Sequence, residues 1–322
     1  MFGRRMTRTR IFFTSDLHGS NAVFMKFLNA AKFYKADAVI VGGDITGKMI
    51  VPVLQMPGGK QKALYLNSET ILSTVEEVTK FKKLIHSAGL YFYETNEEEM
   101  RKLKEDHEML EALFVKLMVG RIEEWVNIAD EKLRGTQVQC FMQPGNDDRY
   151  EIDDALKRSQ RIIDPEGTVQ QIGSHEMIST GHANITPWHC PRDLEEAELE
   201  SLVRDMAAKL TKPSNALFCI HVPPYKSLLD IAPILDKDLK PRMDAAGGFE
   251  NAPVGSTAVR KVIEEYQPLM GLHGHIHESR GASKIGRTLC VNPGSEYGEG
   301  ILRGVVIDLE EERVKDYAFT QG

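Results

Sequence analysis

A strand, a helix and a second strand follow one another within the first 44 residues, and each strand ends in a polar loop. Residues 10–14 form a short apolar run that leads into residues 15–19, SDLHG. Apolar residues at helical spacing follow over 20–34, and the buried run 38–41 then ends in Gly-Gly-Asp. Such a βαβ unit requires parallel strands with a helix packed on the sheet. The chain is therefore predicted to be an α/β protein with polar residues at the carboxyl edge of its sheet.

The same rhythm returns after residue 135. Three further apolar runs are predicted strands, and each leads directly into a loop that contains asparagine or histidine: 138–142, 216–220 and 268–272. Helices are expected at 195–209 and 257–266, and the tail from 288 to 318 alternates like antiparallel strands. The chemistry-bearing residues are therefore predicted to gather at strand ends that share one edge.

Residues 48–135 interrupt this rhythm and are predicted to be an insertion within a single domain that spans 1–322. Two short strands, 50–55 and 61–66, flank Pro-Gly-Gly and predict a β-hairpin. A helix is expected over 68–88, closed by Gly89, and a second helix from Thr95 to near Gly135. The helices would form a lid that sets substrate size, enlarge the core or make an interface.

Composition excludes several classes of protein. The chain has 40 lysine and arginine residues and 47 aspartate and glutamate residues, which gives a net charge of -7. This charge disfavours nonspecific nucleic-acid binding, because such binding needs a basic surface. The four cysteines show no CxxC spacing, which disfavours a disulfide scaffold or a zinc ribbon. The basic first ten residues lack a following apolar segment, and no run of about 18 apolar residues occurs. We therefore expect a cytoplasmic protein without membrane association.

Seven residues that follow the predicted strands carry metal-ligating groups: Asp16, His18, Asp44, Asn146, His221, His275 and His277. This mixed nitrogen and oxygen set suits Mn, Fe, Co, Ni or Zn better than calcium. Residues two apart in an extended segment point to the same side, so Asp16 with His18, and His275 with His277, can each chelate. Seven ligands suit two ions that share a carboxylate, and we therefore predict two divalent metal ions as cofactors.

A charge count favours phosphate as the group bound there. Two divalent ions would carry four positive charges, of which Asp16 and Asp44 cancel two. The remaining positive charge would attract a phosphate and stabilise charge that develops during its transfer. The expected partner is thus a small phosphorylated substrate.

The order Asp-x-His, Gly-Asp, Gly-Asn, His, Gly-His-x-His resembles the calcineurin-like metallophosphoesterase superfamily, and the match extends from Asp16 to His277. The resemblance implies a four-layer α/β/β/α sandwich with metals at the carboxyl ends of the strands. It also implies that each metal has three ligands and that Asp44 bridges the two. The first metal would be held by Asp16, His18 and His277, and the second by Asn146, His221 and His275.

Two departures from the family pattern bear on the chemistry. Asp147 stands where the family usually has a histidine that protonates the leaving group or steadies the phosphate, and an aspartate beside a positive site is a poor proton donor. Asp147, by its place, and His182, in the loop after the predicted strand 177–180, are the candidate catalytic residues. The arginine by which protein phosphatases of this superfamily clamp phosphate is also absent after Asp44, which disfavours a phosphoprotein phosphatase.

The sequence therefore predicts an enzyme, a dinuclear, metal-dependent phosphoesterase for which manganese is the first ion to test. Its predicted reaction is hydrolysis of a phosphodiester or pyrophosphate-type bond by a hydroxide that bridges the two ions. Three alternatives stay open: a phosphomonoesterase with another proton donor, a nuclease with a local basic groove, and a non-catalytic scaffold that retains the metal site.

Overall fold

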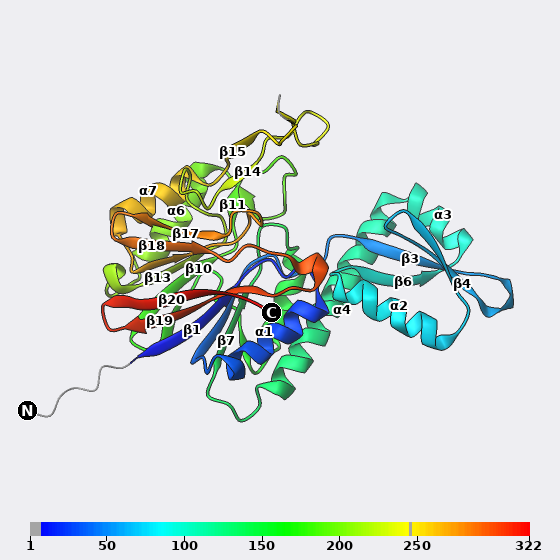
Figure 1. The fold of residues 1–322 in the computed structure, drawn as a ribbon, viewed down its shortest axis with the longest axis horizontal. Coiled ribbons are helices and arrows are strands. Elements are labelled where there is room, and N and C mark those ends of the chain that lie inside the picture. Colours follow the sequence, from blue (N-terminus) through cyan, green and yellow to red (C-terminus); the bar gives the residue numbers. More distant parts are fainter. Residues whose placement is uncertain (1–7, 245–246) are drawn as a thin grey trace, which may run out of the picture.

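Two six-stranded sheets packed face to face form the centre of the computed structural model, which describes residues 8–244 and 247–322 (Figure 1). The basic segment 1–7 lies outside the described residues. The first sheet has the order β20 (Arg313–Gln321), β19 (Arg303–Glu310), β1 (Thr9–Thr14), β2 (Ala38–Gly42), β7 (Gln139–Gln143) and β8 (Ile162–Ile163). The second has the order β17 (Gly281–Ile285), β18 (Thr288–Asn292), β16 (Met270–Leu272), β13 (Leu217–Ile220), β10 (His175–Thr180) and β9 (Val169–Ile172).

Side-chain alternation along β1 shows how the layers arise. Ile11 and Phe13 point into the core between the two sheets, whereas Phe12 points to the outer face, where helices pack. Strands β1, β2, β7 and β8 are mutually parallel, and so are β10, β13, β16 and β18. Their carboxyl ends carry the loops that hold the predicted metal ligands.

Helices cover both outer faces. The first sheet packs against α1 (Asn21–Phe33), α4 (His107–Lys132) and α5 (Asp153–Lys157), and the second against α6 (Glu196–Ala207) and α7 (Thr257–Tyr266). The predicted α/β/β/α arrangement is confirmed. None of the helices among the described residues has both the length and the apolar composition needed to span a bilayer.

The insertion is more elaborate than the sequence predicts. The hairpin is present as β3 (Ile50–Gln55) and β4 (Gln61–Tyr65), but β5 (Ser68–Leu72) and β6 (Tyr91–Thr95) extend it to a four-stranded sheet. The expectation of a helix from residue 68 is wrong, because that segment pairs with β4. Helix α2 (Val75–Ser87) begins only after Thr74, whose side chain forms a capping box with Glu77.

The expected second helix is two helices. Asp106 separates α3 (Glu97–Glu105) from α4, and its carboxylate accepts a hydrogen bond from Met109 N at 3.0 Å, which caps α4. The second half of α4 packs in the main core, where the Trp125 ring stacks on Phe24 with 4.2 Å between centroids. The insertion is thus anchored to the sandwich by a helix that belongs to both.

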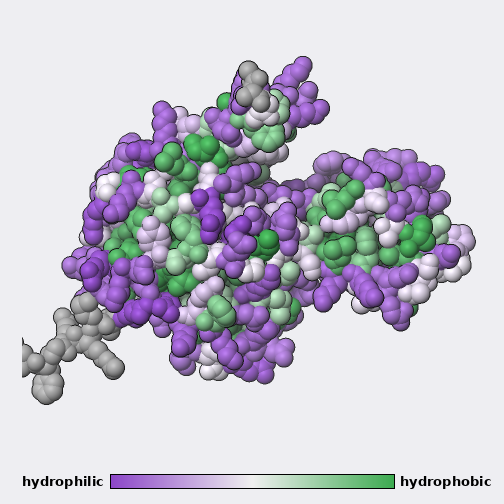
Figure 2. All heavy atoms as spheres, in the orientation of Figure 1, coloured by the Kyte–Doolittle hydropathy of each residue, from purple (hydrophilic) through white to green (hydrophobic). Residues whose placement is uncertain are grey.

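In Figure 1 the rest of the insertion projects away from the two sheets, and Figure 2 shows that hydrophobic residues gather on part of its surface. The three predicted roles of the insertion, as a lid, as an enlargement of the core or as an interface, stay predictions. The remaining short elements are η1 (Pro57–Gly59), η2 (Tyr150–Ile152), η3 (Pro213–Asn215), η4 (Tyr297–Glu299), β11 (Ala183–Asn184), β12 (Asp193–Leu194), β14 (Ile231–Pro233) and β15 (Asn251–Pro253).

Candidate metal centre

The loops after β1 and β2 lie side by side and are held together by backbone hydrogen bonds. Asp16 N donates to Gly43 O and His18 N donates to Asp44 O, both at 2.9 Å. Asp16, His18, Asp44 and His275 all have left-handed backbone conformations, with φ of 58°, 41°, 51° and 67°. Side chains other than glycine adopt this conformation at a cost, and such strain clusters at functional sites. Four predicted ligands are therefore held in strained positions by the loops around them.

Glycines next to the predicted ligands allow the loops to approach closely. A Cβ atom on Gly145 would lie 2.1 Å from Asp44 Oδ1, and one on Gly43 would lie 2.3 Å from His221 Nδ1. A Cβ on Gly274 would lie 2.5 Å from Asp16 Oδ2. These distances are too short for any side chain, which explains why glycine precedes Asp44, Asn146 and His275.

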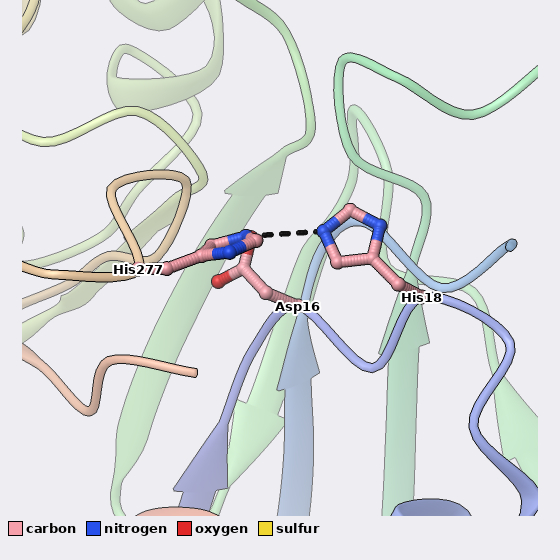
Figure 3. A group of neighbouring side chains, drawn as sticks. All are labelled: Asp16, His18 and His277. Atoms are coloured by element: carbon pink, nitrogen blue, oxygen red, sulfur yellow. Dashed lines mark hydrogen bonds and ion pairs between the residues drawn. The ribbon is translucent and has the colours of Figure 1, made fainter. Parts of the chain in front are cut away.

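Asp16, His18 and His277 form the first group of ligands. Ligand-type atoms of the three residues lie within 4.8 Å of one another. Figure 3 shows the two imidazole rings facing each other, with the Asp16 carboxylate beside the His277 ring. The two Nε2 atoms are 3.1 Å apart, and His277 Nε2 is 3.5 Å from Asp16 Oδ1.

Asp44, His221 and His275 form the second group, again with ligand-type atoms within 4.8 Å of one another. His221 Nε2 lies 3.4 Å from Asp44 Oδ1, while His18 Nε2 of the first group lies 3.6 Å from Asp44 Oδ2. The two carboxylate oxygens of Asp44 thus face one group each. The bridging role implied for Asp44 stays a prediction.

Buried polar atoms without hydrogen-bond partners point to missing ligands in this region. His221 Nδ1 donates to Gly42 O at 2.8 Å, which leaves Nε2 buried and without a hydrogen bond, although it lies 3.4 Å from Asp44 Oδ1. Asn146 Nδ2 donates to Asp193 Oδ1 at 2.8 Å, which leaves Asn146 Oδ1 buried and unpartnered. A buried polar atom without a partner is costly, and a metal ion would satisfy both. The donor set therefore fits divalent metal binding.

The charges of the two groups are strongly coupled. Burial opposes ionisation of Asp16, but the hydrogen bond from His277 and the charges of His277 and His221 together outweigh it and lower the pKa of Asp16 to about 2. Burial would lower the pKa of His221, yet the charges of Asp44 and Asp16, together with hydrogen bonding, raise it to about 9. Burial and the charge of His221 lower the pKa of His275 to about 4. Burial also opposes ionisation of Asp44, but the charges of His221, His18 and Lys48 outweigh it and hold the pKa of Asp44 well below its usual range. Both carboxylates are therefore anionic at neutral pH, as metal binding requires.

The two predicted catalytic residues lie in different surroundings. Asp147 Oδ2 is 2.7 Å from Lys48 Nζ, and Asp147 also forms a third group of ligand-type atoms with His18 and Asp44. His182 Nδ1 lies 3.0 Å from Thr180 Oγ1 and 3.3 Å from Glu166 Oε1. The structure therefore brings Asp147 to the predicted metal ligands, whereas the contacts of His182 are with Thr180 and Glu166. The catalytic roles of both stay predictions.

Three residues of the centre were not singled out in the sequence. Asp193 orients the Asn146 amide, Lys48 contacts Asp147, and the Tyr297 ring lies 4.6 Å from the His18 ring, centroid to centroid. The position of Lys48, four residues after Asp44 in GDITGK, is the one signal in the sequence that could have identified any of them.

A surface cavity of about 510 Å³ opens beside His277. Its lining includes Tyr297, Ser295, Arg280 and Arg303. His277 is 28% exposed, while the side chains of His18 and Asp16 are fully buried. The centre is therefore accessible from the side that His277 and the cavity share.

Comparison with known proteins supports the fold. No family model matches the chain. The uncharacterized protein MJ1162 of Methanocaldococcus jannaschii is 34% identical over 159 residues, which cover 49% of this chain and 63% of that relative. The match thus spans less than two thirds of the relative's length.

Two crystal structures, one of them of TT1561 from Thermus thermophilus, match with TM-scores of 0.53 and 0.51 at 15% and 14% identity. Each match covers 98% of this chain and 99% of the other. An archaeal phosphodiesterase matches over 98% of this chain and all of its own length, with a TM-score of 0.33 and 11% identity. The two matches with TM-scores above 0.5 support the two-sheet sandwich fold over nearly the whole chain.

Proposed function

We propose that this protein is a metal-dependent phosphoesterase that hydrolyses a phosphodiester or pyrophosphate-type bond with two divalent metal ions. The observation that carries the proposal is the position of Asp44 between two groups of ligand atoms, with Oδ1 toward His221 and Oδ2 toward His18. A carboxylate in this position favours two neighbouring ions over one, as in hydrolytic two-metal sites.

The proposal assigns the seven predicted residues to the two ligand sets that the family resemblance implies. Asp16, His18 and His277 would hold one ion, Asn146, His221 and His275 the other, and Asp44 both. When bound, two such ions supply an activated water and stabilise the charge that develops on the phosphate oxygens. In the reaction a water oxygen bonds to phosphorus, the ester P–O bond breaks, and the leaving oxygen takes up a proton.

The protein's own residues supply orientation and charge. Gly42 O holds the His221 ring through Nδ1, so that Nε2 faces the centre, and Asp193 does the same for the Asn146 amide. Asp147 pairs with Lys48, so this part of the site adds no net charge. The two positive charges left after Asp16 and Asp44 are counted would attract an anionic phosphate ester. The neighbouring cavity of about 510 Å³ has the size of a small-molecule site.

The test compares hydrolysis of a chromogenic phosphodiester with that of its monoester, using protein stripped of metal and protein reloaded with manganese. The proposal predicts faster cleavage of the diester and activity only after reloading. Equal activity of the stripped protein would contradict metal dependence, and a strong preference for the monoester would contradict the proposed substrate class.

A further inference from the structure

Lys48 lies at the exposed rim of the candidate metal centre. Its Nζ atom is 2.7 Å from Asp147 Oδ2, and 47% of its side chain is exposed, against 30% for Asp147. Asp147 is fixed from the other side, because its backbone N donates to Asp44 Oδ1 at 3.2 Å. The loops after β2 and β7 therefore place an ammonium group on Asp147, whose backbone is hydrogen-bonded to the carboxylate of Asp44.

The charge of Lys48 acts on both sides of the centre. It interacts electrostatically with Asp44, with His18 of the first ligand group and with His277. Asp16, His18 and Asp44 are buried, whereas His277, Asp147 and Lys48 are each partly exposed. Lys48 thus belongs to the partly exposed residues at the boundary between solvent and the buried ligands.

We infer that Lys48 binds the phosphate group of the substrate and that Asp147 positions it for this role. The inference rests on the proposed function, because it assigns a contact to the same substrate. An ammonium group has three N–H donors, and the bond to Asp147 occupies one of them. The other two are free to donate to anionic phosphate oxygens, in charge-assisted hydrogen bonds.

The ion pair between Lys48 and Asp147 explains how the site binds phosphate although it lacks two residues that the family resemblance leads one to expect. The arginine clamp is absent after Asp44, and Asp147 occupies the position of the usual histidine. Lys48 supplies a cation from the loop that lacks the arginine, and Asp147 fixes its position from the loop that lacks the histidine. Phosphate recognition is thereby divided between two residues.

Binding of inorganic phosphate to the manganese-loaded full chain, measured by calorimetry, tests the inference. Lys48→Met removes the charge and keeps much of the length, Lys48→Arg keeps the charge, and Lys80→Met on the exposed face of α2 is the matched control. Manganese content is measured for each protein. Loss of a hydrogen bond to a charged group predicts roughly 10-fold to 100-fold weaker phosphate binding for Lys48→Met. Lys48→Arg should retain most of the affinity, and Lys80→Met all of it.

Asp147→Asn tests the positioning role. This variant should weaken phosphate binding less than Lys48→Met does, and adding it to Lys48→Met should weaken binding no further, because its effect acts through Lys48. Fully additive losses would contradict the positioning role. For the diester, Lys48→Met should raise KM while manganese content stays at the wild-type value.

Equal phosphate affinity of wild type and Lys48→Met, or loss of manganese from Lys48→Met, would overturn the inference, and so would the absence of phosphate binding by wild type. If the wild type fails to cleave the diester but binds phosphate through Lys48, the proposed reaction is wrong while the phosphate contact stands. If the wild type cleaves the diester and Lys48→Met binds phosphate as tightly as the wild type does, the proposed reaction stands and the phosphate contact of Lys48 is wrong.

Discussion

His221 Nε2 lies 3.4 Å from Asp44 Oδ1, although the two residues come from different sheets of the sandwich. The His221 ring is held by its Nδ1 hydrogen bond to Gly42 O, at the end of β2, two residues before Asp44. The same strand end therefore supplies the carboxylate and orients the imidazole from the opposite sheet. The seam between the two sheets is where the candidate metal centre is built.

Replacement of Asp44 by asparagine tests the bridging role. Asp44→Asn keeps the size of the side chain but removes the charge that faces His221 and His18. We expect fewer than two manganese ions per chain and at least about 100-fold less diester hydrolysis, because the lost charge stabilisation amounts to several kcal/mol. Elemental analysis and the diester assay measure the two effects. Asp205→Asn, on an exposed position of α6, is the control. Full activity of Asp44→Asn without bound metal would refute the scheme.

Gly145 is predicted to be irreplaceable for steric reasons. In Gly145→Ala the new Cβ would lie 2.1 Å from Asp44 Oδ1 and 2.2 Å from Asp44 N, so one of the two loops must move. We expect weaker manganese binding and a loss of stability of about 1–3 kcal/mol. Gly120→Ala, in the interior of α4 with open space around the new Cβ, should instead raise stability by about 0.5–1 kcal/mol. Calorimetry and urea unfolding compare the two variants, and unchanged metal affinity of Gly145→Ala would contradict the prediction.

Much of the centre follows from the sequence because its ligands lie directly after strands. Once β1, β2 and β7 are parallel, Asp16, Asp44 and Asn146 must share an edge, whatever the details of the loops. The contact between Lys48 and Asp147 is different, since it depends on how two loops from neighbouring strands fold toward each other. A contact between two loops leaves no periodic pattern of apolar residues in the sequence. It was therefore not predicted.

The secondary structure of the insertion was also only partly predictable from the sequence. The segment 68–72 was expected to be helical, yet it pairs with β4, because a tertiary partner overrides local preference. The break between α3 and α4 depends on the single cap formed by Asp106, within a stretch whose apolar spacing reads as one helix. Long elements with periodic apolar residues were predictable from the sequence. The strand partner of residues 68–72 and the helix cap at Asp106 were not.

His182 remains the candidate proton donor for monoester substrates. Its ring is held by Thr180 and Glu166, and its Nε2 lies 3.5 Å from the Tyr150 hydroxyl. We predict that His182→Gln abolishes any residual hydrolysis of the monoester and changes kcat for the diester by less than about threefold, since a diester with a good leaving group needs no proton donor. Steady-state kinetics on both substrates measure this. An equal loss on both would assign His182 a role in the common step or in folding.

The pair of Asp308 with Arg10 predicts a dependence of stability on pH. Asp308 Oδ1 accepts from Arg10 Nε at 2.8 Å, and the hydrogen bonds from Arg10 and Arg8 lower the pKa of Asp308 from 3.8 to about 2. A lowered pKa stabilises the folded state above about pH 4, and this contribution is lost as pH falls toward 2. Asp308→Asn should therefore cost about 1–2 kcal/mol at pH 6 and progressively less below pH 4. Urea unfolding of both proteins across this range checks it, and a difference independent of pH would contradict the assignment.

The most direct test of the two-metal account is a stepwise titration of metal-stripped protein with manganese, in which bound metal and diester hydrolysis are measured on the same samples. The account predicts two bound ions per chain and hydrolysis that reaches its full rate only as the second ion binds. Full hydrolysis with one ion bound, or in the stripped protein, would contradict it.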